Sequence, residues 1–302
     1  MKQIEAAILR TVLYANIFSF PLTVEEIHHF LIDEQPASLE TVRDTLQEST
    51  ALQRWLRYER GYVLYGEQHD LIDVRLAHEA ASEQLWWMAL RYGRWLARLP
   101  FVRMVALTGA LAMRNAASED DDLDYLVITT PGRVWLARAF TIVLVRLARL
   151  RGMTICPNYI VAENNLIQTD ENIFVAHEVV QALPLYGHSL YRQMRAANEW
   201  THTYLPNADT PFYKTEDYWP GWGWRRAKHL GEFLFGGRLG NQLEQWEYRR
   251  KLQRFASEMQ TPHSAARLDE TQVKGHFNDH GHPALRRYYE QLKACGLADD
   301  DG

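Results

Sequence analysis

The 302-residue sequence predicts a mostly helical α+β protein. Residues 1–66 show three short helical patterns followed by two short strands, and residues 100–163 alternate between strand and helix patterns. After residue 170 the pattern becomes helical. A chain of this length is expected to hold two or three domains. We therefore predict an N-terminal domain at 1–66, a connecting helix at 67–99, a small mixed-sheet core at 100–169 and a helical C-terminal domain at 170–302.

The composition is that of an ordinary folded protein, with 47% hydrophobic and 24% charged residues. A net charge of −5 argues against a polyanion-binding protein of the kind that depends on bulk charge. Cys156 and Cys295 are too few for a disulfide framework or a zinc ribbon. No signal peptide is visible, and arginines interrupt the most apolar run, 134–150. We expect a cytoplasmic protein without a membrane partner.

The N-terminal domain has the order of elements typical of a winged helix. Apolar residues recur at helical spacing over 2–16, and Thr23 and Ser38 are placed to cap a second and a third helix. The segment 52–66 is predicted to form two short strands around a turn at Gly61. Three helices followed by a hairpin indicate a winged-helix module.

The charges of this module disfavour duplex DNA as a partner. Residues 1–66 hold six Lys or Arg and nine Asp or Glu, and the third helix carries three acids against one arginine. Duplex binding depends largely on neutralising phosphates. Only the predicted hairpin is basic, through Arg54, Arg57 and Arg60. The module is better suited to packing within the protein or to docking a protein partner.

The segment 67–99 is predicted to be one long helix, because it has no proline and no internal glycine before Gly93. We expect it to pack on the following domain through an apolar stripe: Trp86, Trp87, Leu90, Trp95 and Leu96.

The core is predicted to contain buried strands at 102–107 and 123–128, a helix at 133–151 and a third strand at 153–162. Because proline cannot donate a ladder hydrogen bond, Pro157 should place the third strand at a sheet edge or mark a bulge near the site.

Two acids open the second strand of the core. Asp122 and Asp124 are two residues apart, so their side chains point to the same face of the strand. Two carboxylates on one face are costly unless a cation lies between them. This pair is the strongest functional signal in the sequence. A solvated acidic turn is the competing interpretation, since residues 119–122 are all acidic.

The turn Leu107-Thr108-Gly109-Ala110, followed after eleven residues by Asp122-Leu123-Asp124-Tyr125, resembles the signature of the polymerase-β-like nucleotidyltransferase superfamily. The resemblance covers residues 102–163. The whole chain also looks like bacterial proteins that join an N-terminal winged helix to such a domain and a helical C-terminal part. The resemblance implies transfer of a nucleoside monophosphate from a nucleoside triphosphate to an acceptor, with pyrophosphate released.

The same resemblance implies Mg²⁺, one ion or two, held by Asp122 and Asp124. The chemistry agrees, because nucleotidyl transfer depends mainly on positioning and charge neutralisation. Gly109 would let the backbone approach the triphosphate. The family prefers glycine or serine where this chain has alanine, so a neighbouring threonine is the substitute hydroxyl. The predicted nucleotide-binding residues are Thr108, Gly109, Ala110, Arg114 and Asn158.

A third carboxylate is expected on the third strand of active family members. Here Asn158 occupies the middle of that strand and Glu163 ends it, so Glu163 is the candidate third catalytic acid beside Asp122 and Asp124, with Asp170 as a weaker alternative. If the third acid is lost, the alternative function is a catalytically weak or inactive protein of this fold that binds a nucleotide or a partner and acts as a regulator.

The C-terminal half is predicted to be helical at 172–183, 188–205 and 225–259, with an aromatic loop at 210–224 and a break at Gly236-Gly237. The segment from residue 225 is basic, which is compatible with an RNA acceptor. Residues 260–282 are expected to be mobile, 283–295 to form a closing helix and 298–302 to be disordered. His276, His280 and His282 match no compact metal motif, and mobile histidines are the favoured interpretation.

Overall fold

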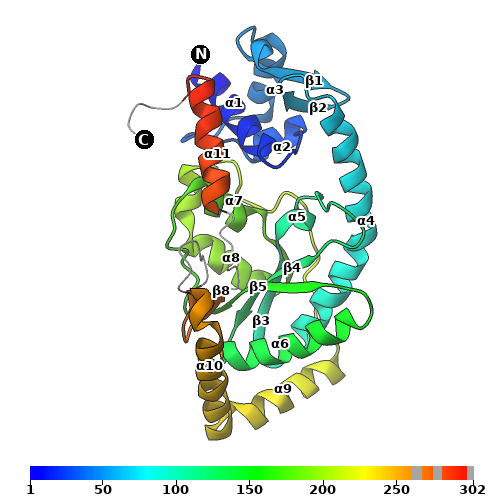
Figure 1. Ribbon diagram of the computed structural model, residues 1–302, viewed down its shortest axis with the longest axis vertical. Helices are drawn as coiled ribbons and strands as arrows, with labels where there is room; N and C mark the ends of the chain where they lie inside the picture. Colours follow the sequence, from blue (N-terminus) through cyan, green and yellow to red (C-terminus); the bar gives the residue numbers. More distant parts are fainter. Residues whose placement is uncertain (260–266, 275–280, 298–302) are drawn as a thin grey trace.

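The computed structural model describes residues 1–259, 267–274 and 281–297. The chain is 54% helical and carries a mixed sheet, which confirms the mostly helical α+β class. The segment 1–66 lies at one end, the sheet in the middle, and α9 and α10 at the other end (Figure 1). No helix in these ranges is long and apolar enough to cross a bilayer.

The segment 1–66, called the N-terminal module below, follows the predicted order of three helices and a hairpin. Thr23 and Ser38 cap the second and third helices by accepting hydrogen bonds from the amides of Glu26 and Thr41. The elements are α1 (Gln3–Asn16), α2 (Val24–His29), α3 (Leu39–Glu48), the short 3-10 helix η1 (Leu52–Arg54), β1 (Leu56–Glu59) and β2 (Tyr62–Tyr65).

Two arginines of the β1–β2 hairpin are already paired with acids near the start of α4 (Asp70–Ala97). Arg57 lies 2.5 Å from Glu67, and Arg60 lies 2.6 Å from Asp73. The basic hairpin therefore presents much less positive charge to a polyanion than its sequence suggests.

Helix α4 forms as predicted, but its buried face differs from the predicted stripe. Leu85 and Tyr92 are buried, whereas the side chain of Trp87 is 71% exposed and Trp95 is 36% exposed. Neighbouring helical residues point about 100° apart, so Trp86 and Trp87 cannot both face the core. The prediction that all five residues line one packed face is therefore wrong.

The central sheet has six strands in the order β6-β3-β4-β5-β8-β7. Within the described residues, β4 and β5 run parallel and the other neighbouring pairs are antiparallel. The strands are β3 (Val102–Leu107), β4 (Leu123–Thr129), β5 (Ile155–Ala162), β6 (Leu183–Tyr186), β7 (Arg267–Leu268) and β8 (Gln272–Lys274).

The segment 170–302 is not purely helical, because it contributes β6 and the β7–β8 hairpin to the central sheet. Helix α7 (Ile173–Gln181) ends before Leu183, where the residue preceding Pro184 is biased towards an extended conformation. The predicted helix through residue 183 is therefore wrong at its end, and the next residues pair with β3 instead.

Pro157 causes a bulge and does not make β5 an edge strand. Asp124 of β4 pairs with Cys156, whereas Leu126 pairs with Tyr159, so β5 holds one extra residue between these pairs. Strand β8 pairs only with residues 159–161 of β5, and the proline therefore needs no partner on that side. The bulge confirms the second of the two predicted outcomes and lies beside Asp124.

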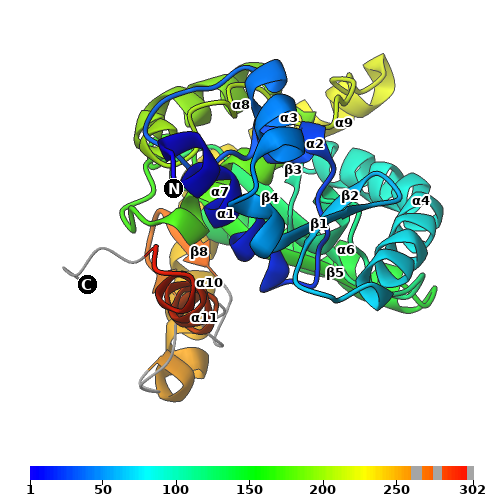
Figure 2. The same cartoon turned by 90° about the horizontal axis from the view of Figure 1, so that it is seen from above.

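The remaining helices are α6 (Val134–Arg149), α8 (His188–Ala197), α9 (Trp222–Gly236), α10 (Arg238–Met259) and α11 (Gly281–Ala294), with the short α5 (Gly109–Ala112) and η2 (Glu199–Thr203). Gly237 separates α9 from α10, as predicted. Seen from above, α4 runs along one side of the molecule and α10 and α11 lie on the opposite side (Figure 2). Of the segment 260–282, residues 267–274 form the β7–β8 hairpin and α11 begins at Gly281, while 260–266, 275–280 and the tail 298–302 lie outside the described residues.

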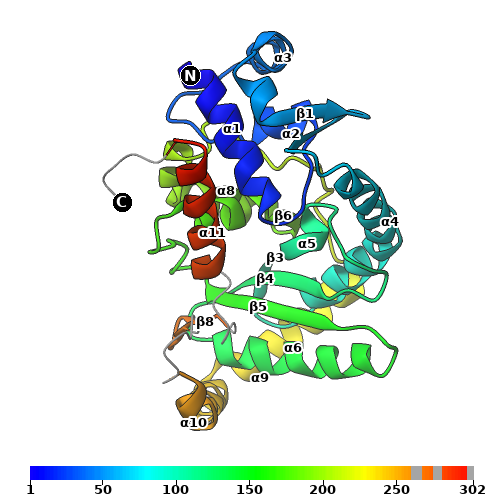
Figure 3. The ribbon, with the colours of Figure 1, turned by 45° about the horizontal axis from the view of Figure 1, so that its top comes forward.

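Two cores position the site. One joins the N-terminal module to α7 and α11, with Ile8, Val180 and Leu292 among its buried side chains. The other joins α4 and α6 to one face of the sheet. Figure 3 shows α6 on one side of β4 and β5, and α1 and α11 on the other.

Candidate functional site

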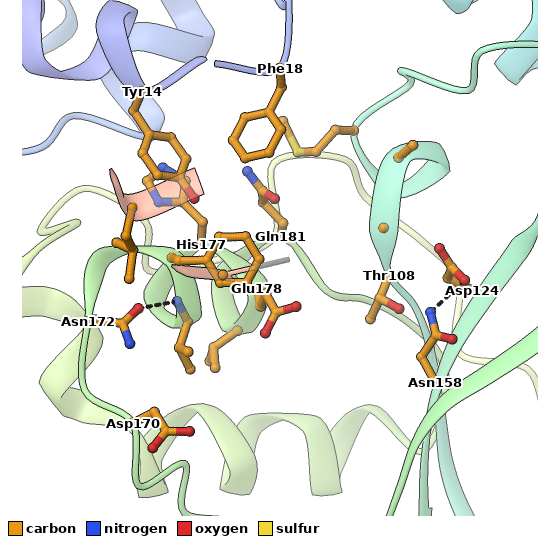
Figure 4. A pocket seen from close by; sticks show the side chains of 18 of the residues that line it. Tyr14, Phe18, Thr108, Asp124, Asn158, Asp170, Asn172, His177, Glu178 and Gln181 are labelled. Atoms are coloured by element: carbon orange, nitrogen blue, oxygen red, sulfur yellow. Dashed lines mark hydrogen bonds between the residues drawn. The ribbon is translucent and has the colours of Figure 1, made fainter. Parts of the chain in front are cut away.

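A cavity of about 1260 Å³ lies between the N-terminal module and the sheet. One side is formed by the β3–α5 turn, β4 and β5, and the opposite side by α7, with Arg267, Lys274 and the start of α11 nearby (Figure 4). Side chains from α1 and the loop after it cover the cavity, and we call them the roof: Tyr14, Phe18, Phe20 and Leu22. The N-terminal module therefore forms one wall of the site.

The turn at Gly109 packs directly against Asp124. Gly109 has φ of +68°, a conformation that favours glycine, and a Cβ atom added there would lie 2.2 Å from Oδ2 of Asp124. The amide of Thr108 also donates a hydrogen bond of 3.0 Å to the carbonyl of Asp124. The structure thus brings together the two halves of the motif that are separated in sequence.

Asp124 lines the cavity and is held by an amide. Nδ2 of Asn158 donates to Oδ1 of Asp124 at 2.5 Å, and the bulge at Pro157 precedes that asparagine. Burial raises the pKa of Asp124 to about 7, with the nearby Asp122 carboxylate adding to the effect and the Asn158 hydrogen bond opposing it. The carboxylate form is therefore costly in the absence of a cation.

Asp122 lies just before β4, is exposed, and is not among the residues that line the cavity. The thiol of Cys156 donates to Oδ2 of Asp122 at 3.4 Å. Burial and the two aspartates raise the pKa of Cys156 to about 12, so this cysteine stays protonated at neutral pH and is a poor nucleophile.

Glu163 does not approach the aspartates, and its predicted role as third catalytic acid is wrong. Its amide donates to the carbonyl of Thr129 at 2.9 Å, which places it beyond the last residue of β4. Strands β4 and β5 are parallel and Asp124 pairs with Cys156, so Glu163 lies seven residues further along, roughly 20 Å away at strand spacing. Only the first half of β5 can face Asp124.

Asp170, the weaker alternative, does line the cavity. Both of its carboxylate oxygens accept hydrogen bonds of 2.6 Å from Arg267, which offsets its charge. Asp170 therefore lies on the cavity wall as the acidic partner in an ion pair with Arg267.

Arg114 is turned away from the cavity. Its guanidinium lies 3.9 Å from the ring centre of Trp86, and burial lowers its pKa. Helix α5 ends at Ala112, so no second helical turn directs this side chain back towards Gly109. Of the predicted nucleotide-binding residues, Thr108, Gly109, Ala110 and Asn158 line the cavity and Arg114 does not.

Helix α7 contributes polar residues that sequence reasoning missed. His177, Glu178 and Gln181 line the cavity at helical spacing, in a segment that reads as an ordinary packed helix. His177 is only 4% exposed and stacks on Tyr14, with 3.9 Å between the ring centres. In the sequence these three residues show only helical spacing. That spacing is the same for a helix that lines a cavity and for a helix packed in a core.

His177 is neutral at physiological pH, because burial lowers its pKa to about 4. Its Nδ1 lies 2.9 Å from the carbonyl oxygen of Ile173. Since a carbonyl only accepts, Nδ1 carries the proton and Nε2 is left as a hydrogen-bond acceptor. The imidazole is therefore suited to accept a hydrogen bond from a hydroxyl or amide group.

Basic side chains line the cavity near β5 and α11. Nζ of Lys274 lies 3.9 Å from Oε2 of Glu178, and Arg267 is paired with Asp170. Arg286 and His282 of α11 also line the cavity, while His276 and His280 lie outside the described residues. Such cations suit a ligand that carries phosphate charge.

Asp122 and Asp124 are the candidate ligands for Mg²⁺, although only Asp124 lines the cavity. Within the described ranges no three His, Cys, Asp or Glu side chains form a metal-binding group. Mg²⁺ commonly takes one or two carboxylates and completes its shell with phosphate oxygens and water. Asp124, with its raised pKa, and Asp122 supply that number.

Comparison with protein-family models, with curated proteins and with solved structures gives no match to this chain. The cavity combines three features that bear on function: a glycine turn against a buried aspartate, an amide partner for that aspartate, and a facing helix with polar side chains.

Proposed function

We propose that this protein is a Mg²⁺-dependent nucleotidyltransferase that moves a nucleoside monophosphate from a nucleoside triphosphate to an acceptor. In this proposal β3 to β5 form a polymerase-β-like core and the N-terminal module is a winged helix. The observation that carries the proposal is the packing of Gly109 against Asp124 at the wall of a large cavity. This contact unites the glycine turn and the acidic strand of the motif.

Each residue has a definite part in this scheme. Asp122 and Asp124 would hold Mg²⁺, which when bound supplies charge neutralisation to the triphosphate. Thr108 lines the cavity, where its hydroxyl would donate to a phosphate oxygen, and Gly109 lets the turn pack against the Asp124 carboxylate because it has no side chain. Asn158 orients Asp124 through its hydrogen bond. Arg286 adds positive charge to the cavity.

One observation favours a second function, a nucleotide-binding regulator with little or no transferase activity. The position on β5 that faces Asp124 holds Asn158, which brings no charge and is a poor general base. The carboxylate predicted to compensate, Glu163, lies at the other end of the strand. Both functions require nucleotide binding. Only the transferase would also transfer the nucleoside monophosphate to an acceptor.

The proposal is tested with ATP as the probe. Calorimetric titration of the full chain with MgATP should give saturable binding that Asp124→Asn weakens at least about tenfold, the loss expected for a metal ligand. Glu163→Gln is the matched control, because it removes an acid that lies far from the cavity. Equal MgATP affinity in the wild type and Asp124→Asn would falsify the proposal.

Turnover is measured with α-labelled ATP, Mg²⁺ and cell extract. Label transferred by the wild type and lost in Asp124→Asn supports the transferase. MgATP binding without any Asp124-dependent label supports the regulator.

The proposed winged helix acts here as a wall of the cavity. Two of its three hairpin arginines are paired with acids, and Glu40, Asp44 and Glu48 of α3 are exposed. These features support a docking or structural role over duplex DNA binding. An outward acidic helix suits a basic protein partner.

A further inference from the structure

We propose that α7 forms the acceptor end of this cavity, and that Glu178 takes the proton from a hydroxyl group of a small, polyhydroxylated acceptor bound there. The inference depends on the proposed nucleotidyl transfer, and it supplies from a helix the acid that β5 lacks.

The two ends of the cavity lie on opposite sides of one space. Thr108, Asp124 and Asn158 lie on the strand side, and His177, Glu178 and Gln181 lie on the α7 side (Figure 4). The carboxylate of Glu178 points into the cavity towards the strand side (Figure 4). Helices α5 and α7 are also in contact, so the two sides belong to one site. A group held between them meets Asp124 on one side and Glu178 on the other.

The position of Glu178 is tied to the same strand that holds Asn158. Lys274 pairs with Tyr159, the residue after Asn158, across the β5–β8 ladder. Nζ of Lys274 in turn lies 3.9 Å from Oε2 of Glu178. A chain of contacts therefore connects the Asp124–Asn158 pair to the Glu178 carboxylate. Glu178, whose side chain is 47% exposed, therefore lines the same cavity as the Asp124–Asn158 pair.

The size of the cavity indicates two small ligands. Sites for single small molecules usually measure about 300 to 1000 Å³. The cavity here is about 1260 Å³, so a nucleotide leaves room for a second molecule. Tyr14 and Phe18 of the roof cover this room, and a polymer such as RNA would have to displace them to enter. A small acceptor fits without any such movement.

The side chains at the α7 end indicate the chemistry of that acceptor. His177 offers a neutral acceptor atom, and the amide group of Gln181 offers both a donor and an acceptor. Of the cations that line the cavity, Lys274 is paired with Glu178 and Arg267 with Asp170. Neutral hydroxyl groups match such a lining better than a strongly charged acceptor does.

The reaction balances with the groups present. An acceptor hydroxyl oxygen attacks the α-phosphorus, its O–P bond forms, and the bond from the α-phosphorus to the bridging oxygen breaks. Pyrophosphate leaves with that electron pair. The hydroxyl proton passes to the Glu178 carboxylate and then to solvent, which reaches this exposed side chain. No oxidant or reductant is required.

The test separates binding from transfer. MgATP affinity is measured by calorimetry, and pyrophosphate release is measured with MgATP and a mixture of glycerol, myo-inositol and glucose. Glu178→Gln should leave MgATP affinity within about twofold and lower pyrophosphate release at least about a hundredfold, the usual share of a general base. His177→Gln should raise KM for the polyol with little change in MgATP affinity. Glu163→Gln, outside the cavity, should change neither quantity.

Three outcomes would overturn the inference. If Glu178→Gln releases pyrophosphate as fast as the wild type, Glu178 does not accept the proton. If Glu178→Gln loses as much MgATP affinity as Asp124→Asn does, Glu178 binds the nucleotide and not the acceptor. MgATP binding by the wild type without polyol-dependent release removes the small acceptor while leaving nucleotide binding intact. An absence of MgATP binding in the wild type is a different result, because it overturns the proposed function itself.

Discussion

Asn158 donates a 2.5 Å hydrogen bond to Asp124 at the position where a third carboxylate would otherwise face the proposed metal. The bulge at Pro157 adds one residue to β5 just before this asparagine. The side-chain amide of Asn158 gives an oxygen of Asp124 a hydrogen-bond donor without adding a charge to the site. It therefore stabilises the Asp124 carboxylate when no cation is bound, and in the proposed function it would compete with the metal for that oxygen.

Replacing Asn158 with aspartate tests this balance. Asn158→Asp puts two carboxylates in hydrogen-bond reach, so the metal-free protein should lose about 1 to 3 kcal/mol of unfolding free energy. Added Mg²⁺ should then raise its melting temperature more than it raises that of the wild type. Asn158→Ala is the control, since it loses the hydrogen bond without adding a ligand. Equal Mg²⁺ responses in the two variants would contradict the prediction.

Gly109→Ala should damage both stability and nucleotide binding. Gly132 has nearly the same backbone angle, with φ of +67° against +68°, but open space around the added Cβ. Gly132→Ala should cost about 1 kcal/mol for the left-handed backbone alone. Gly109→Ala should cost about 2 kcal/mol more, because its Cβ displaces Asp124. Urea unfolding measures the difference, and equal losses would remove the proposed steric role.

The pH dependence of stability should carry the signature of Asp124. Its pKa rises from an ordinary 3.8 to about 7 on folding, so the folded protein binds the proton more tightly than the unfolded chain does. The resulting stabilisation is complete below about pH 4 and is lost as the pH rises through 7.

Asp124→Asn removes this titration and keeps a hydrogen-bonding side chain beside Asn158. The variant should match the wild type near pH 3 and exceed its unfolding free energy by about 4 kcal/mol at pH 8, in metal-free buffer. Guanidinium unfolding at both pH values provides the measurement. A difference that does not change with pH would show that Asp124 titrates normally.

Helix α4 offers a direct comparison of a buried and an exposed large side chain. Leu85 is 3% exposed and Trp87 is 71% exposed. Leu85→Ala should lower the unfolding free energy by about 2 to 4 kcal/mol, and Trp87→Ala by less than about 0.5 kcal/mol. Chemical unfolding of the two variants side by side distinguishes them, and a large loss for Trp87→Ala would show that its exposed face is covered in solution.

Local sequence signals predicted the elements well where the cause is itself local. The caps at Thr23 and Ser38 and the strand at 102–107 were predicted correctly, because side-chain capping and buried apolar runs act within a few residues. The short β6 was missed, since a four-residue strand is stabilised by pairing with β3 more than by its own pattern.

Glu163 and Glu178 show why the site itself could not be completed from the sequence. Glu163 is on the expected strand, but the parallel register of β4 and β5 places it at the wrong end. Glu178 is on a helix with no motif, and its approach to the cavity follows from the packing of α7 against α5. Strand register and helix packing are long-range properties that spacing alone does not report.

The sequence by itself determined the α+β class, the glycine turn and the acidic strand, because each depends on the conformational preferences of neighbouring residues. Only the tertiary structure decided that Asn158 faces Asp124, that Glu163 lies far away and that the N-terminal module covers the cavity. These relationships depend on sheet register and on the docking of separate segments. The energies that set them come from contacts between residues far apart in the chain.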